Sequence, residues 1–117
     1  MARKEPDRLA VIRGTLDIFI LRAVSGRALH GFEISLWLEQ HSKGTLDVDD
    51  SALYQALHRL EARRFIEGEW GVSEKNRRAR YYRLTPAGRK HLAAESARLK
   101  SYAKTIASLL NAAPEPR

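Results

Sequence analysis

One stretch decides the fold that we predict for this chain: Asp49-Asp50-Ser51-Ala52-Leu53-Tyr54-Gln55-Ala56-Leu57-His58-Arg59-Leu60-Glu61-Ala62-Arg63-Arg64. Its apolar residues have the i, i+3, i+4, i+7 spacing of one helix face, namely Leu53, Ala56, Leu57 and Leu60. Its polar residues repeat this spacing on the opposite face, namely Ser51, Tyr54, Gln55, His58 and Arg59. The apolar face needs a core, whereas the polar face needs water or a partner with polar edges.

The start of this helix is predicted from its aspartates. Asp49 or Asp50 can accept a hydrogen bond from a free backbone N–H, which sets the first turn and exposes Ser51, Tyr54 and Gln55. A helix offers these positions to base edges when its N-terminal part enters a major groove. A polar helix face is more often simply solvated, so the stretch alone leaves both interpretations open.

Composition narrows the class of protein. A chain of 117 residues suits one domain of about 100 to 150 residues. The net charge of +7 favours a polyanionic partner, either nucleic acid or an anionic membrane. With no cysteine, the chain has no disulfide, thiolate metal site or cysteine nucleophile. No apolar run approaches the roughly 20 residues that span a bilayer, and the N-terminus lacks the apolar core of a signal peptide, so we expect a cytoplasmic protein without membrane contact.

Two further helices and a short strand are predicted before this stretch. The first helix starts at Thr15 and stops at Ser25-Gly26, and the second runs from about Leu29 to His41. Gly31 costs a helix about 1 kcal/mol relative to alanine, which suggests a close approach by another backbone or a loosely helical first turn. Trp37 is expected to anchor the core. The alternation over residues 45–48 predicts a short strand.

After Arg64 the pattern changes to the two-residue period of strands. Residues 65–70 and 80–84 alternate in this way, with Ile66, Gly68 and Trp70 on one expected side of the first strand. They predict an antiparallel hairpin in which polar and cationic residues gather in the connection and at the start of the second strand, namely Lys75, Asn76, Arg77, Arg78 and Arg80. Because like charges repel, this cluster favours contact with phosphate over a role in folding.

The last predicted helix starts at Thr85-Pro86, an N-cap hydroxyl followed by a proline suited to the first helical position, and continues to about Asn111. Its apolar stripe lasts for roughly three heptads and consists of Leu92, Leu99, Tyr102, Ile106, Leu109 and Leu110. Such a helix extends beyond a small body, so we expect a second copy to cover the stripe. The alternative is that the helix folds back on its own core.

Five segments resemble, in order and spacing, the PadR family of bacterial transcriptional regulators. They are Leu16-Asp17-Ile18-Phe19-Ile20-Leu21, His30-Gly31-Phe32-Glu33-Ile34, Ser51-Ala52-Leu53-Tyr54-Gln55-Ala56-Leu57-His58-Arg59-Leu60-Glu61, Ile66-Glu67-Gly68-Glu69-Trp70 and Arg80-Tyr81-Tyr82-Arg83-Leu84-Thr85-Pro86-Ala87-Gly88. The resemblance implies a homodimer that binds a palindromic operator, usually as a repressor, and releases it on binding a small molecule. Some relatives sandwich flat drugs between aromatic side chains of the last helix. Here Leu99 stands near that position with Tyr102 close by, so no effector is assigned.

We therefore expect a mainly α (α+β) winged helix-turn-helix with a two-stranded wing and a long C-terminal dimerisation helix. The expected parts are a basic arm over 1–12, the winged helix-turn-helix domain over 13–84, the dimerisation helix over 85–111 and a tail over 112–117. The expected contacts with double-stranded DNA are Ser51, Tyr54, Gln55, His58, Arg59, Lys75, Asn76, Arg77, Arg78 and Arg80. An adaptor that binds an acidic protein is the alternative.

An enzyme is not expected. The four histidines form no metal-ligand or catalytic grouping, and the sequence has neither a phosphate-binding glycine loop nor a nucleophile elbow. No catalytic residue, metal site or cofactor is therefore predicted.

Overall fold

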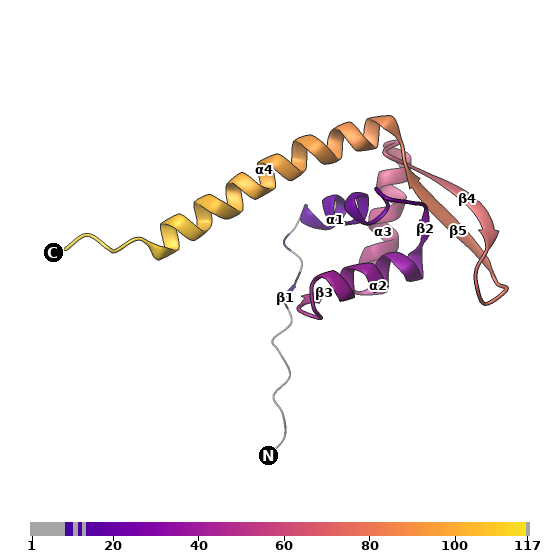
Figure 1. The fold of residues 1–117 in the computed structure, drawn as a ribbon, viewed down its shortest axis with the longest axis horizontal. Coiled ribbons are helices and arrows are strands. Elements are labelled where there is room, and N and C mark those ends of the chain that lie inside the picture. Colours follow the sequence, from indigo (N-terminus) through magenta and orange to yellow (C-terminus); the bar gives the residue numbers. More distant parts are fainter. Residues whose placement is uncertain (1–8, 11, 13, 117) are drawn as a thin grey trace, which may run out of the picture.

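The structure is a computed structural model that describes residues 9, 10, 12 and 14–116. The elements are, in chain order, β1 (Leu9–Ala10), α1 (Thr15–Ala23), β2 (Leu29–His30), α2 (Gly31–His41), β3 (Leu46–Asp47), α3 (Asp50–Ala62), β4 (Ile66–Val72), β5 (Arg78–Leu84) and α4 (Pro86–Asn111). Figure 1 shows α1, α2 and α3 grouped together, with the β4–β5 hairpin projecting at one end and α4 extending away at the other. The predicted winged helix-turn-helix, with its long last helix, is confirmed. The basic arm expected over 1–12 lies largely outside the described residues.

The core lies among the three short helices and the base of the hairpin. Its largest fully buried side chains come from all of these elements, namely Ile20, Leu21, Val24, Ile34, Leu53, Leu57, Leu60 and Ile66. Trp37 packs against this cluster, as predicted. Most of these residues have the helical spacing that predicted a buried face, so the apolar pattern specifies which sides of the helices meet.

A third strand, β2, pairs with the hairpin. The predicted start of the second helix at about Leu29 is therefore wrong. Leu29 pairs with Tyr82 and His30 with Tyr81, so β5 lies between β2 and β4. The helix begins only at Gly31, because the backbone of the two preceding residues belongs to the sheet. His30 caps it: its Nδ1 accepts a 3.3 Å hydrogen bond from the Glu33 N–H, and Glu33 Oε1 accepts one of 3.1 Å from the His30 N–H.

The short strand predicted over 45–48 is present as β3. It pairs in parallel with β1, with Leu9 opposite Leu46, and the Leu9 N–H donates a 2.6 Å hydrogen bond to the Thr45 carbonyl oxygen. The segment before α1 is thereby joined to the segment before α3.

Helix α4 begins in close contact with the segment that links α3 to β4. Thr85 is its N-cap: the hydroxyl accepts a 2.9 Å hydrogen bond from the Gly88 N–H and donates one of 2.7 Å to the Arg64 carbonyl oxygen. The Thr85 N–H also donates a 3.0 Å hydrogen bond to the Phe65 carbonyl oxygen. Gly88 leaves the room for this approach, because a Cβ there would lie 2.8 Å from the Phe65 carbonyl carbon and closer still to its oxygen.

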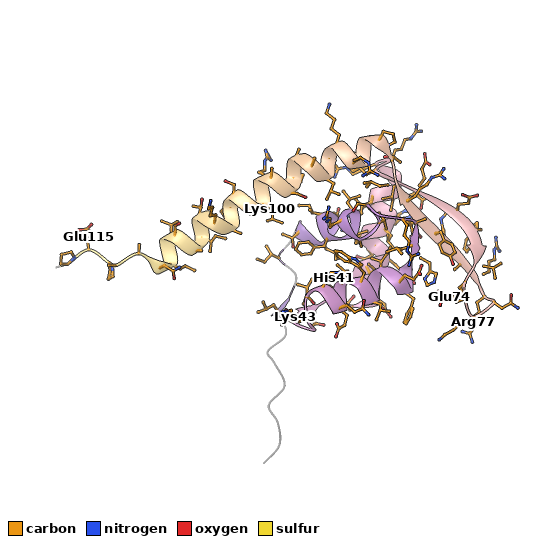
Figure 2. All side chains as sticks on the ribbon, in the orientation of Figure 1. His41, Lys43, Glu74, Arg77, Lys100 and Glu115 are labelled. Carbon is orange, nitrogen blue, oxygen red and sulfur yellow. The ribbon has the colours of Figure 1, made fainter. Side chains whose placement is uncertain are left out.

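The two halves of α4 have different surroundings. Leu92 is buried in the core, whereas every residue from Ser101 to Asn111 is exposed. Figure 2 labels Lys100 partway along the helix, at the point from which it extends past α1. The alternative of a helix folded back on its own core is therefore wrong for the second half.

Candidate nucleic-acid interface

Helix α3 places its two faces as the sequence predicts. Its N-cap is Asp49, whose Oδ1 accepts a 2.7 Å hydrogen bond from the Ala52 N–H. The apolar residues are buried, namely Leu53, Ala56, Leu57 and Leu60. The polar residues are exposed, namely Ser51, Tyr54, Gln55, His58 and Arg59. The side of α3 turned away from the core is therefore open to a partner.

Tyr54 rests against the start of α2. A Cβ at Gly31 would lie 2.6 Å from the Tyr54 hydroxyl oxygen, so the absence of a side chain at Gly31 makes room for the ring. The expectation that another backbone approaches Gly31 is thus wrong, because a side chain does so. Tyr54 still has 54% of its surface exposed, so the ring is held in place with one side facing solvent.

Arg59 has a partner within the chain. Its Nη2 lies 2.8 Å from Oδ1 of Asp17 in α1, and its side chain is 53% exposed. An ion pair this exposed contributes little to stability. The guanidinium is therefore oriented by Asp17 and remains open on its other side.

The tip of the hairpin is a tight turn whose cationic side chains are exposed. The Ser73 N–H donates a 2.7 Å hydrogen bond to the Arg77 carbonyl oxygen, and the Asn76 N–H donates one of 2.9 Å to that of Ser73. Asn76 has a φ of 58°, a left-handed conformation that asparagine adopts more readily than most residues. Lys75, Arg77 and Arg78 are exposed, and Figure 2 shows Arg77 at the tip.

An open cleft of about 720 Å³ lies between the start of α2, the outer face of α3 and the hairpin. Its walls include Tyr54 from α3, Phe32 from α2, and Lys75, Arg77 and Arg78 from the hairpin. Tyr54, on the exposed face of α3, and the cationic tip therefore border the same space. An extended polyanion lying across one element would meet the other.

Two exposed aromatic rings in this cleft were not singled out from the sequence. Trp70 was expected on a half-buried side of its strand, but it is 53% exposed. It lies in the second half of β4, and Figure 1 shows the β4–β5 hairpin projecting beyond the helices. The Arg78 guanidinium carbon lies 4.2 Å from the centroid of the Trp70 ring. Phe32 is also exposed, with the Lys75 ammonium nitrogen 6.0 Å from its ring centroid. In the sequence, only the closeness of each aromatic residue to cationic residues could have indicated that these rings are exposed. Strand alternation predicts which side chains share a side of the strand, but not how far the core extends along it.

Arg80 differs from the other hairpin cations because it faces α3. Its Nη2 donates a hydrogen bond to Oε2 of Glu61, and the two side chains are 31% and 32% exposed. This hydrogen bond raises the pKa of Arg80 above its usual value. Burial, with the Glu61 carboxylate adding to the effect, raises the pKa of the neighbouring Tyr82 hydroxyl. Both groups therefore keep their protons, and Arg80 is already paired within the protomer.

The residues of the stripe predicted for dimerisation lie in three environments. Leu92 packs in the core of its own protomer, so it is not available to a partner. Leu99 lines a groove of about 980 Å³ between α1 and α4, together with Ile18 and Phe19. The remaining residues are exposed on the second half of α4, namely Tyr102, Ile106, Leu109 and Leu110.

The histidines occupy separate places. His30 caps α2, His58 is exposed on α3, and His41 and His91 each stack on an aromatic ring. In the part of the chain that the structure describes, no three histidine, cysteine or acidic residues gather as a metal site would require. No helix within residues 14–116 has both the length and the apolar character needed to cross a bilayer.

Comparison with known proteins matches residues 20–94 to the family described as "Transcriptional regulator PadR-like family". The transcriptional regulator Rv3488 of Mycobacterium tuberculosis is 34% identical over 95 residues, which are 80% of this chain and 84% of that protein. A solved transcriptional regulator from Clostridium thermocellum has a TM-score of 0.74 at 30% identity, covering 83% of this chain and 94% of its own. A PadR-like transcriptional regulator from Bacillus cereus has a TM-score of 0.74 at 26% identity, covering 86% and 96%. Sequence and fold therefore lead to the same group of proteins.

Proposed function

This chain belongs to the PadR-like family of transcriptional regulators, which is not a family of enzymes, and from that premise we propose that it binds a palindromic DNA operator as a homodimer. In this proposal α3 lies in the major groove, with Tyr54, Gln55 and His58 toward the base edges and Ser51 on a base or a phosphate. The hairpin, as the wing, lies on the flanking backbone with Lys75, Arg77 and Arg78. Arg59 enters the groove beside His58, and Asn76 lies on the backbone with the wing cations.

The single observation that carries the proposal is the shared cleft. Tyr54 on the exposed face of α3 and the wing cations Lys75, Arg77 and Arg78 line the same space. Base edges are read by hydrogen-bonding side chains in the major groove, whereas phosphates attract cations without regard to sequence. One duplex crossing this side of the molecule would meet both kinds of group.

The homodimer is supported by the exposed second half of α4. Tyr102, Ile106, Leu109 and Leu110 present apolar surface that no part of the protomer covers in the described chain. A second copy covers it with the same stripe, since two-fold symmetric interfaces use one patch twice. The two α3 helices would then read half-sites about one DNA turn apart, about 34 Å.

By resemblance to the family, the dimer acts as a repressor and is released from its operator by a small-molecule effector. The proposed operator can be tested by selecting the fragments of the source genome that the protein binds. A recurrent two-fold symmetric site is the expected result, whereas fragments without a shared sequence would contradict sequence-specific binding and leave the protein-binding adaptor as the alternative.

Replacing both Arg77 and Arg78 by alanine should weaken binding to every duplex by a similar factor. The reason is that phosphate contacts carry no sequence information, so their loss changes affinity and not preference. If each arginine contacts one phosphate, the slope of log affinity against log salt should fall by about two, at roughly 0.9 per contact. Fluorescence anisotropy with operator and random duplexes at several salt concentrations measures both quantities.

The control for this double variant is Arg83→Ala. Arg83 is an exposed wing arginine on the face of β5 opposite to Arg78, where it lies 3.0 Å from Glu67. Its removal should leave the salt slope within experimental error. Equal slopes for the double variant and the unsubstituted protein would rule out the proposed wing contacts.

A further inference from the structure

Arg80 is directed toward the helices, although it lies in the most cationic part of the chain. On β5 it shares one face with Arg78 and Tyr82, since alternate residues of a strand point the same way. Tyr82 is buried over the core, whereas Arg78 is exposed near the tip. Arg80 therefore lies where the hairpin leaves the body of the protein.

The neighbouring strand leaves a gap for the Arg80 side chain. Arg80 pairs with Trp70 and Tyr82 with Gly68, so Gly68 is the diagonal neighbour of Arg80 on β4. A Cβ at Gly68 would lie 2.7 Å from the Arg80 guanidinium carbon and 2.8 Å from Nη2. Any other residue at position 68 would displace the guanidinium from its path across the strand.

The path of the side chain ends at Glu61, in the last turn of α3. Glu61 and Arg80 are 19 positions apart in the chain, and their pair joins the helix to the hairpin. The Trp70 ring covers the same guanidinium, with its centroid 5.6 Å from the guanidinium carbon. A planar cation held by a carboxylate on one element and an aromatic ring on another is restricted in direction as well as position.

The angle between the wing and α3 matters for binding. A strand of seven residues is about 23 Å long, at about 3.3 Å per residue. A swing of about 10° at its base moves the tip by about 4 Å, which is longer than a hydrogen bond. The phosphate contacts of the tip and the base contacts of α3 can form on one duplex only if this angle is maintained.

We propose that Arg80 is a positioning residue and not a DNA contact: its ion pair with Glu61, routed over Gly68, sets the angle of the wing relative to α3. This inference rests on the proposed function, because the angle matters for a partner that meets both elements. Arg80 is then not one of the DNA contacts, and DNA binding depends on Glu61 as well.

The test is Glu61→Gln, for which the two roles of Arg80 predict opposite signs. If Arg80 contacts DNA, removing a negative charge beside it leaves affinity unchanged or raises it. If Arg80 positions the wing, the variant should bind the selected operator about tenfold more weakly, the equivalent of one charge-assisted hydrogen bond. Its salt slope should also fall, although the protein has become more positive by one charge.

Glu67→Gln is the matched control. It removes the same charge from an exposed ion pair with Arg83 that lies within the hairpin and does not reach α3. This variant should bind as well as the unsubstituted protein or slightly better. Arg80→Lys keeps the charge but not the forked guanidinium, so it should reproduce the loss seen with Glu61→Gln.

A readout without DNA separates failure of this inference from failure of the proposed function. The chain has two tryptophans, so Trp37→Phe leaves Trp70 as the only one. In that background Glu61→Gln should make Trp70 emission more accessible to acrylamide, and Glu67→Gln should not. Unchanged or tighter operator binding by Glu61→Gln, or unchanged quenching of Trp70, overturns the positioning role. If the unsubstituted protein binds no duplex, the proposed function fails, and the quenching comparison decides whether Arg80 holds the wing.

Discussion

Replacing Leu109 and Leu110 by glutamate is expected to produce a folded monomer whose operator affinity is lower by about 10²- to 10⁴-fold, because the linked second half-site is lost. These side chains are 71% and 80% exposed in the protomer, so its own core does not depend on them. Burying a leucine at an interface contributes about 1.5 to 3 kcal/mol, and a symmetric interface would use each leucine twice. Four carboxylates facing one another would also repel.

Sedimentation velocity gives the oligomeric state of this variant, and anisotropy with the operator gives its affinity. Circular dichroism should show that its helical content is retained. The matched control is Ser101→Glu with Ser108→Glu, which adds the same charge on the opposite side of α4. If the leucine variant still sediments as a dimer, or binds the operator as tightly as this control, the proposed dimer surface is wrong.

Gly88→Ala should cost about 2 to 4 kcal/mol of unfolding free energy, the largest loss of stability expected from adding a single methyl group to this chain. The estimate combines about 1 to 3 kcal/mol for overpacking with about 1 kcal/mol for a weakened hydrogen bond. The added Cβ would meet the Phe65 carbonyl, which is part of the backbone and already accepts a hydrogen bond from the Thr85 N–H. Relief of the clash requires α4 to move away from the end of α3.

Urea unfolding measures this loss, with the midpoint and the slope fitted separately. Gly26→Ala is the control, since a Cβ there would meet nothing within 4 Å. That variant should be neutral or slightly more stable, because alanine restricts the unfolded chain. A loss for Gly88→Ala no greater than that of the control would show that α4 tolerates displacement and that its start does not hold it to α3.

Much of the candidate interface could be predicted because its determinants are local. The buried and exposed faces of α3 follow from helical spacing, and its start follows from the Asp49 side chain. Thr85 and the proline after it similarly identify the start of α4. The cations of the wing tip lie between two alternating segments, so a hairpin necessarily brings them to its end.

Other features depend on residues far apart in the chain, and spacing does not reveal them. The strand Leu29–His30 is too short to show a period, and it exists because β5 pairs with it. Trp70 alternates correctly, but its exposure depends on where the helices end beneath the hairpin. Periodicity describes one element at a time and contains no information about the surface against which that element packs.

The sequence by itself determined the four helices, the hairpin, their order and the outer face of α3, since these depend on residues within a few positions of one another. Only the tertiary structure decided the partners of individual charges. Arg59 turns to Asp17, 42 positions away, and Arg80 to Glu61, whereas Arg77 and Arg78 remain exposed. The physical reason is that an arginine side chain is long and flexible, so its direction depends on which carboxylate the fold brings within reach.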